Sequence, residues 1–367
     1  MKQLVKRQPV KHRLSALPAP VRAVLPYAVL VAALLLVPFV FTRVPPYTMG
    51  DGVLMVILAT GAIGLVPLTG YAGQVSLGQA AFYGTGAYTT AVLTTQLHVG
   101  AWTALLAGAA LSGLAAYLLG LALFRAAGHY LTLATITVGL ILGVVVKQLD
   151  FTGGAQGLAG VAPLSLFGTP VTDDVSFYYL AAAVLLAATA VVHLVCRSLF
   201  ARVLLAVHDS PVAAQSAGVD PAPVKRSMFV LAAVFSSAGG SLYASWAAFV
   251  DSGTLGLNLS LQLLIIVTVG GRRSVFGPVA GAFVVMSLGR FAKEWLPQVS
   301  EHAGGQVEII AYGLALVLVL RLLPRGVLGF PRVAGLSSRA PSCQDGRRTA
   351  HERERESEHG PQQQTTR

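Results

Sequence analysis

Residue types that could perform catalysis or hold a metal ion are few and scattered in this sequence. The two cysteines, Cys196 and Cys343, form no C-x-x-C pair, so no metal or redox motif is present. The chain contains no G-x-x-x-x-G-K-[ST] phosphate loop, no G-x-G-x-x-G after a strand and no H-E-x-x-H pair. Nor does it gather a nucleophile, an acid and a base, as a membrane enzyme would require. We therefore expect no catalytic residue, metal or cofactor, and any ATP that is used must be bound by another chain.

Ionisable residues within the apolar part of the sequence are equally sparse. Carriers driven by ion gradients usually keep carboxylates or histidines deep in the membrane, because proton and ion relays need them. His193, Lys147 and Glu308 all lie near the ends of apolar runs, where snorkelling explains them. Apart from Asp51, the second residue of its span, Glu308 is the only carboxylate inside a predicted span. A secondary, ion-coupled solute transporter that uses Glu308 is therefore the alternative function.

One uncharged polar segment interrupts the apolar runs at Gly70-Tyr-Ala-Gly-Gln-Val-Ser-Leu-Gly78. Its glycines and two polar side chains would make a poor continuous helix, and irregular backbone at membrane depth is tolerated only when it is buried in protein or lines a wet cavity. The segment therefore predicts a broken or re-entrant element beside a pathway through the membrane, and an ordinary cytoplasmic turn is the alternative. The predicted pathway residues here are Tyr71, Gly73, Gln74, Ser76 and Gly78.

A second glycine-rich segment, Thr152-Gly-Gly-Ala-Gln-Gly-Leu158, lies in a long loop on the other predicted side. Glycine permits tight turns with positive φ. Thr152, Gly153 and Gly154 are predicted to contact a partner or the mouth of the pathway, and a compact loop is an equal alternative.

The longest polar loop, residues 197–225, contains an alanine-rich stretch around Val212 to Ala217 that favours a short helix, with Gly218 as its C-terminal stop. A short amphipathic helix on a membrane face suits docking into a groove of a partner protein, although an interfacial helix without a partner has the same pattern. The predicted docking residues are Ala201, Arg202, Ala206, His208, Asp209, Ala213, Ala214 and Gly218.

The elements that must position these segments are membrane helices. Hydrophobic residues make up 54% of the chain and charged residues only 11%, against roughly 25% in a soluble domain, and the mean hydropathy is +0.69. A membrane helix needs about 20 mostly apolar residues. We predict an all-α, polytopic transmembrane helical bundle of about ten spans, at residues 24–41, 50–69, 79–96, 101–124, 129–148, 177–196, 227–249, 258–271, 274–292 and 306–323.

The distribution of charge predicts the orientation of this bundle. The net charge is +11, yet the basic residues lie at the two ends and between apolar runs, which is the pattern of cytoplasmic loops and not of nucleic-acid binding. Placing both termini in the cytoplasm puts most of the 26 lysines and arginines inside. The expected organisation is a basic cytoplasmic segment over residues 1–23, a transmembrane domain over 24–330 and a polar, disordered cytoplasmic tail over 331–367.

Together the motifs resemble the permease subunits of bacterial ABC importers for branched-chain amino acids, the LivM-type group. The resemblance covers about residues 24 to 330, and its blocks are Gly70–Tyr88, Thr152–Leu158, Ala214–Gly218 continuing to Ala238–Ala244, Gly270–Ala282 and Leu323–Gly329. It implies a permease in the bacterial cytoplasmic (inner) membrane that pairs with a second, similar permease. Two ATP-binding cassette ATPases and an extracytoplasmic solute-binding protein would complete the importer, and the loop around 201–218 would dock on the ATPase.

Two positions depart from the family's pattern. The family usually has Ile-Arg and an acidic residue where this chain has Val207-His208-Asp209, and a glycine where this chain has Arg272-Arg273. Both departures affect the expected coupling contacts and not the fold. The resemblance leaves the solute open among branched-chain amino acids, urea, amides and other small organic molecules.

Overall fold

The computed structural model describes residues 19–43, 47–124, 130–154, 156–166 and 168–299, with residues 313, 321 and 326–328. The chain divides into a unit of residues 1–329 and a second unit of 330–367, and only the first contains described residues. The predicted tail and nearly all of the predicted span 306–323, including Glu308, lie outside the described residues.

Helices make up most of the described chain, as the composition predicts. They are α1 (Ala19–Arg43), α2 (Met49–Ile63), α3 (Gln79–Thr95), α4 (Ala101–Leu123), α5 (Tyr130–Gln148), α6 (Asp174–Arg197), α7 (Leu199–Asp209), α8 (Pro211–Ser216), α9 (Pro221–Ala247), α10 (Leu257–Gly270) and α11 (Gly277–Val299). The first nine predicted spans each overlap one of these helices, with ends that differ by up to seven residues. Within the described residues, α4, α6 and α9 are long and apolar enough to cross a membrane, and the total of ten spans stays a prediction.

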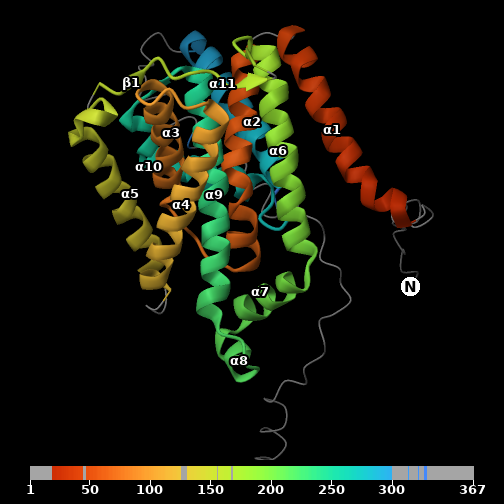
Figure 1. Cartoon of the computed structure of the whole chain (residues 1–367). Coiled ribbons are helices and arrows are strands. Elements are labelled where there is room, and N and C mark those ends of the chain that lie inside the picture. The colour runs from red at the N-terminus through yellow and green to blue at the C-terminus, as the bar shows by residue number, and fades with distance from the viewer. Residues whose placement is uncertain are drawn as a thin grey trace, which may run out of the picture. The chain divides into compact units, whose positions relative to one another are not determined.

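Short strands join two loops that are far apart in the sequence. β1 (Leu158–Ala159) pairs antiparallel with β4 (Phe249–Val250), with Leu158 opposite Val250. β2 (Ser165–Leu166) and β3 (Thr169–Pro170) form a second antiparallel pair. Figure 1 shows β1 at one end of the bundle and α7 with α8 at the other. We call these the strand end and the α7 end.

Helix α9 lies at the centre of the bundle and packs against α2, α3 and α4 (Figure 1). Small residues permit these contacts: a Cβ on Gly240 would overlap the carbonyl of Tyr83 in α3, and a Cβ on Gly86 would overlap the carbonyl of Ser237. In lipid, where no hydrophobic drive holds helices together, such close backbone approach is a main source of packing energy.

Large apolar side chains cover the outer faces of α4 and α5. They include Leu106, Leu111, Leu114 and Leu118 on α4, and Leu133, Leu140, Ile141 and Val144 on α5. A soluble monomer rarely exposes contiguous apolar patches larger than a few hundred Å². These faces are therefore suited to contact with lipid.

Polar contacts at each end of the bundle join segments that the distribution of basic residues along the sequence assigns to one side of the membrane. At the α7 end, Arg273 Nε donates to the carbonyl of Gly70 at 2.9 Å. At the strand end, Trp246 Nε1 donates to Asp174 Oδ1 at 2.9 Å, and Gln96 Nε2 donates to the carbonyl of Phe151 at 2.7 Å. Which end faces the cytoplasm stays a prediction.

Candidate functional site

The segment after α2 is a break between two helices. The chain continues from α2 into a π-helical turn, η2 (Val66–Tyr71), and helix resumes only at Gln79. Pro67 lacks the N–H that an α-helix would need at this position, and the turn widens so that the N–H of Ala72 bonds to the Pro67 carbonyl at 3.0 Å. Residues 72–78, which we call the helix break, then form irregular backbone.

The helix break extends into the middle of the bundle. Ser76 is fully buried and its Oγ accepts a hydrogen bond from Gln79 Nε2 at 3.3 Å. Gln79 Oε1 accepts from the hydroxyl of Ser236, close to the middle of α9, at 2.9 Å. The N–H of Ala80 donates to Ser260 Oγ in α10 at 2.8 Å. Side chains of α5 satisfy the backbone of the break itself: Thr135 Oγ1 accepts from the N–H of Leu77 at 3.3 Å, and Thr132 Oγ1 donates to the carbonyl of Val75 at 2.9 Å. Irregular backbone in a membrane is tolerated when other parts of the protein satisfy it in this way.

Helices α7 and α8 form an exposed pair at the α7 end, and the predicted helix stop is confirmed. Gly218 follows α8 with φ +84°, a conformation that favours glycine. Ala201, Leu204 and Val207 are buried on one face of α7, and Ala214 is the buried residue of α8. The other predicted docking residues, Arg202, Ala206, His208, Asp209 and Ala213, are exposed.

The exposed pair is in contact with the helix break. Gly73 has φ +67°, and a Cβ at this position would overlap the imidazole of His208. A Cβ on Gly70 would overlap the carbonyl of Arg272, and Tyr71 Oη donates to the Arg273 carbonyl at 3.4 Å. The two sites that depart from the family pattern, 207–209 and 272–273, therefore both contact the short segment 70–73.

The residues Thr152, Gly153 and Gly154 lie at the strand end, away from the helix break. Thr152 Oγ1 donates to the carbonyls of Val146 and Leu149, both at 2.6 Å, and so satisfies the C-terminal end of α5. Gly153 and Gly154 have positive φ, as a compact turn requires. Nothing in this geometry places the loop beside the helix break, and a role for it at a pathway mouth stays a prediction.

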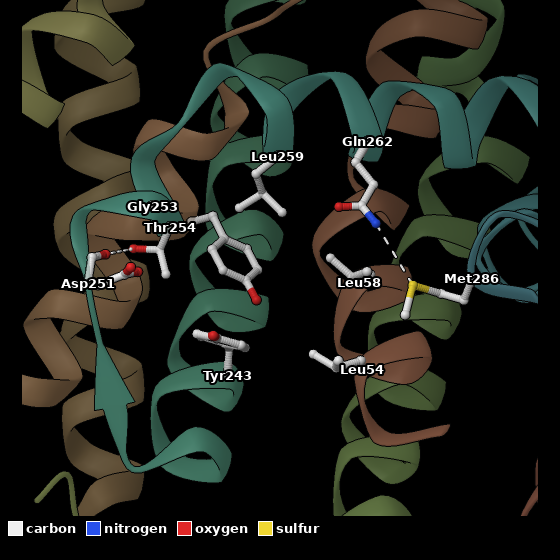
Figure 2. A pocket seen from close by; sticks show the side chains of 10 residues that line it. Leu54, Leu58, Tyr243, Asp251, Gly253, Thr254, Leu259, Gln262 and Met286 are labelled. Atoms are coloured by element: carbon white, nitrogen blue, oxygen red, sulfur yellow. Dashed lines mark hydrogen bonds between the residues drawn. The ribbon is translucent and has the colours of Figure 1, made fainter. Parts of the chain in front are cut away.

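An open cavity of about 250 Å³ lies between α2, α3, α9, α10 and α11 (Figure 2). Pockets for drug-sized ligands have roughly 300–1,000 Å³, so this cavity suits a smaller solute. Figure 2 shows Asp251, Thr254 and Tyr243 on one side and Leu54, Leu58, Gln262 and Met286 on the other. The remaining lining residues are Tyr83, Gly253 and Leu259.

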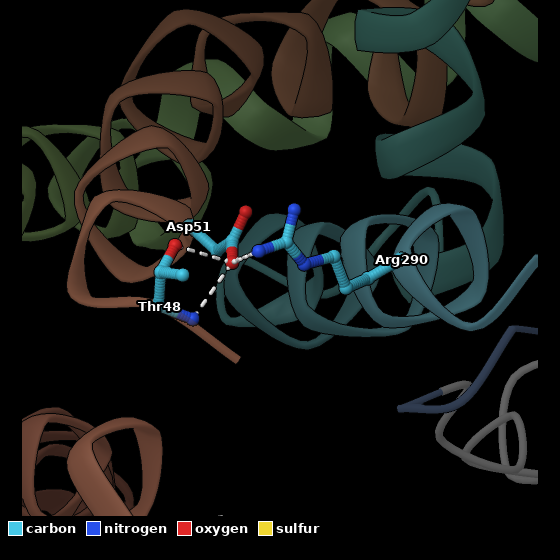
Figure 3. Close-up of polar contacts among 3 residues, drawn as sticks. All are labelled: Thr48, Asp51 and Arg290. Atoms are coloured by element: carbon cyan, nitrogen blue, oxygen red, sulfur yellow. Dashed lines mark hydrogen bonds and ion pairs between the residues drawn. The ribbon is translucent and has the colours of Figure 1, made fainter. Parts of the chain in front are cut away.

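An ion pair joins α2 to α11 beside this cavity. Arg290 Nη2 lies 3.3 Å from Asp51 Oδ2, which also accepts hydrogen bonds from the N–H and hydroxyl of Thr48 at 2.8 and 2.7 Å (Figure 3). Asp51 and Arg290 are one helical turn further toward the strand end than the lining residues Leu54 and Met286. The pair therefore holds together the two helices that form the apolar wall.

Comparison with known proteins decides the family. The family model described as "Branched-chain amino acid transport system / permease component" matches residues 52–323. The chain belongs to this family.

Two curated relatives are named as permease proteins of branched-chain amino acid transport systems. The permease is 27% identical over 294 residues to the high-affinity branched-chain amino acid transport system permease protein LivM of Salmonella typhimurium, covering 74% of this chain and 67% of the relative. It is 26% identical to LivM of Escherichia coli over the same shares of the two chains. No solved structure gives a significant match.

Sequence reasoning did not find the residues that line the cavity. Tyr83, Tyr243 and Gln262 come from three helices that are distant in the sequence. Tyr83 and Tyr243 lie within blocks of the family resemblance, but nothing in those blocks indicates that the two side chains line one cavity. An amide such as Gln262 within an apolar run was the available signal, because polar groups in membrane helices are costly and often functional. The permease's predicted pathway residues at 71–78 lie beside the helix that supplies Tyr83, but they do not line the cavity.

Proposed function

We propose that this permease is one membrane subunit of an ATP-driven ABC importer for branched-chain amino acids or a related small solute. The observation that carries the proposal is the contact between α7 and the helix break. His208 abuts Gly73, and the chain leads from Gly73 through the break into α3, which supplies Tyr83 to the cavity. The exposed helix α7 is thereby connected, through the helix break and α3, to a wall of the cavity.

The partners follow from the family. The sequence has no phosphate-binding loop, so two separate ATP-binding cassette subunits must supply ATP hydrolysis. A second, homologous permease would complete the pathway, and an extracytoplasmic binding protein would deliver the solute. We place the permease in the bacterial cytoplasmic membrane with several spans.

The α7 end is proposed to face the cytoplasm. Arg202, Arg226, Arg272 and Arg273 lie there, and basic residues mark the cytoplasmic side of membrane proteins. The basic segment 1–23 and the tail 331–367 are assigned to the same side. In this orientation the exposed face of α7 and α8 meets the ATPase, and the strand end with Asp51 and Asp251 meets the binding protein.

Transport would then proceed by alternating access. ATP binding moves the ATPase against α7, α7 displaces the helix break through His208, and α3 shifts relative to α10 and α11. The cavity opens to one side and then to the other. A segment with few regular backbone hydrogen bonds is suited to such movement, because it opens at low cost in free energy.

Copurification tests this proposal. The tagged permease is purified from its native membranes in mild detergent, and the associated proteins are identified by mass spectrometry. We expect an ATP-binding cassette subunit and a second hydrophobic permease. Recovery of the permease alone, under conditions that preserve other membrane complexes, would refute the assignment.

A variant on the exposed face localises the contact. Val212 in α8 is 72% exposed, so Val212→Glu should fold normally and lose the ATPase from the purified complex, whereas Val212→Ile should retain it. Ala214 is unsuitable for this purpose because it is buried, and a larger side chain there would disturb α8 itself. Equal recovery of the ATPase with both Val212 variants would show that the docking surface lies elsewhere.

A further inference from the structure

The cavity has one charged lining group, the carboxylate of Asp251. Within the described residues no lysine or arginine lines it, so the field inside the cavity favours a cation over an anion. Tyrosine hydroxyls and the amide of Gln262 are the neutral donors, and Gln262 Nε2 has only a weak contact at 3.8 Å with Met286 Sδ.

Among the described residues, the carboxylate of Asp251 has neither a hydrogen-bond partner nor an ion pair. Asp251 occupies the N-cap position of the 3-10 helix η4 (Ser252–Leu255), yet its side chain makes no capping hydrogen bond. Thr254 Oγ1 bonds instead to the main-chain carbonyl of Asp251 at 2.8 Å (Figure 2). In the described part of the chain the carboxylate enters no ion pair. Asp251 is exposed where the cavity opens, so its carboxylate, which neither caps a helix nor pairs with a cation, is available to a ligand.

The opposite side of the cavity is mainly apolar, with the amide of Gln262 beside it (Figure 2). Leu54 and Leu58 project from successive turns of α2, and Met286 from α11 lies beside them (Figure 2). An aliphatic chain buried against such a wall is removed from water, which favours its binding. A solute that bridges the cavity therefore needs a cationic group at one end and a short aliphatic group at the other.

We propose that Asp251 binds the primary ammonium group of the transported solute, while α2 and α11 receive its aliphatic side chain. The inference rests on the proposed transport function and deepens it, because it selects one solute class among those that the resemblance leaves open. The carboxylate of an amino acid would accept hydrogen bonds from Gln262 and a tyrosine hydroxyl. Urea and simple amides lack the ammonium group and would not use Asp251.

The test uses the permease with its copurified partners in proteoliposomes, with ATP on the ATPase side and saturating binding protein loaded with radiolabelled L-leucine. Asp251→Asn keeps the size of the side chain and removes its charge, and Asp251→Glu keeps the charge. Asp150→Asn is the matched control, because Asp150 is an exposed aspartate at the same strand end that does not line the cavity.

We expect Asp251→Asn to lower the leucine uptake rate at least tenfold, Asp251→Glu to recover a substantial part of it, and Asp150→Asn to stay within twofold of the unaltered protein. All three variants should copurify with their partners as the unaltered protein does, which separates loss of binding from misfolding. Uptake by Asp251→Asn within twofold of the unaltered protein would overturn the inference and leave the importer intact. Failure of the unaltered complex itself to take up leucine would instead refute the proposed solute.

Discussion

Replacement of Gly73 by alanine tests whether the helix break is held against α7 as the structure shows. Gly73 has φ +67°, where an alanine costs about 1–2 kcal/mol of backbone strain. The added Cβ would also overlap the His208 imidazole, and overpacking of this kind costs about 1–3 kcal/mol. The two costs together predict a loss of about 2–5 kcal/mol in the free energy of unfolding.

Two further variants separate the two costs. Gly218 has φ +84° with nothing within 4 Å of an added Cβ, so Gly218→Ala should lose only the backbone part, about 1–2 kcal/mol. In a His208→Ala background the overlap disappears, and Gly73→Ala should again cost only about 1–2 kcal/mol. The coupling between Gly73 and His208 is therefore expected to be about 1–3 kcal/mol.

The assay is thermal unfolding of each purified variant in detergent, compared at one heating rate because membrane proteins often unfold irreversibly. The midpoint temperature of unfolding should fall most for Gly73→Ala and less for Gly218→Ala. In the double variant Gly73→Ala/His208→Ala it should fall by less than the sum of the two single changes. Equal shifts for the two glycine variants, or strict additivity of Gly73→Ala and His208→Ala, would refute the contact.

Three other predictions concern the rest of the bundle. Gly240→Ala should destabilise the permease by about 1–3 kcal/mol, because the added Cβ would overlap the Tyr83 carbonyl. The control is Gly139→Ala, where the nearest atom is 4.0 Å from the added Cβ; in the same unfolding assay it should be neutral or stabilising by up to about 1 kcal/mol. Arg290→Gln should lower stability by only about 0.2–1 kcal/mol, less so in high salt, because its ion pair with α2 is partly exposed; a larger, salt-independent loss would contradict this. Glu308→Gln should reduce uptake only modestly, whereas abolished gradient-driven uptake would favour the ion-coupled carrier.

Much of the helical framework is predictable because membrane helices leave a strong local signal. The runs at 101–124 and 177–196, for example, differ by only a few residues from α4 and α6. The glycines and polar side chains of residues 70–78 likewise predict a break, since such a composition cannot form a stable apolar helix. Both signals lie within single stretches of sequence, where hydropathy and backbone preference determine the structure.

Contacts between distant segments are not predictable in this way. Nothing in the local sequence places His208 against Gly73, because the 134 residues between them must first pack. The same is true of the cavity, whose lining combines Leu54 from α2 with Met286 from α11. The π-helical turn at Pro67 also depends on context, since proline can equally kink an α-helix or end it.

ATP-driven uptake by the reconstituted complex tests the central claim most directly. The permease and its copurified partners are placed in proteoliposomes, and uptake of radiolabelled L-leucine is measured with ATP, with a non-hydrolysable ATP analogue, and with ATP plus a protonophore. We predict uptake that requires ATP hydrolysis and continues when the proton gradient is collapsed. Uptake that proceeds without ATP and stops when the gradient is collapsed would contradict the account.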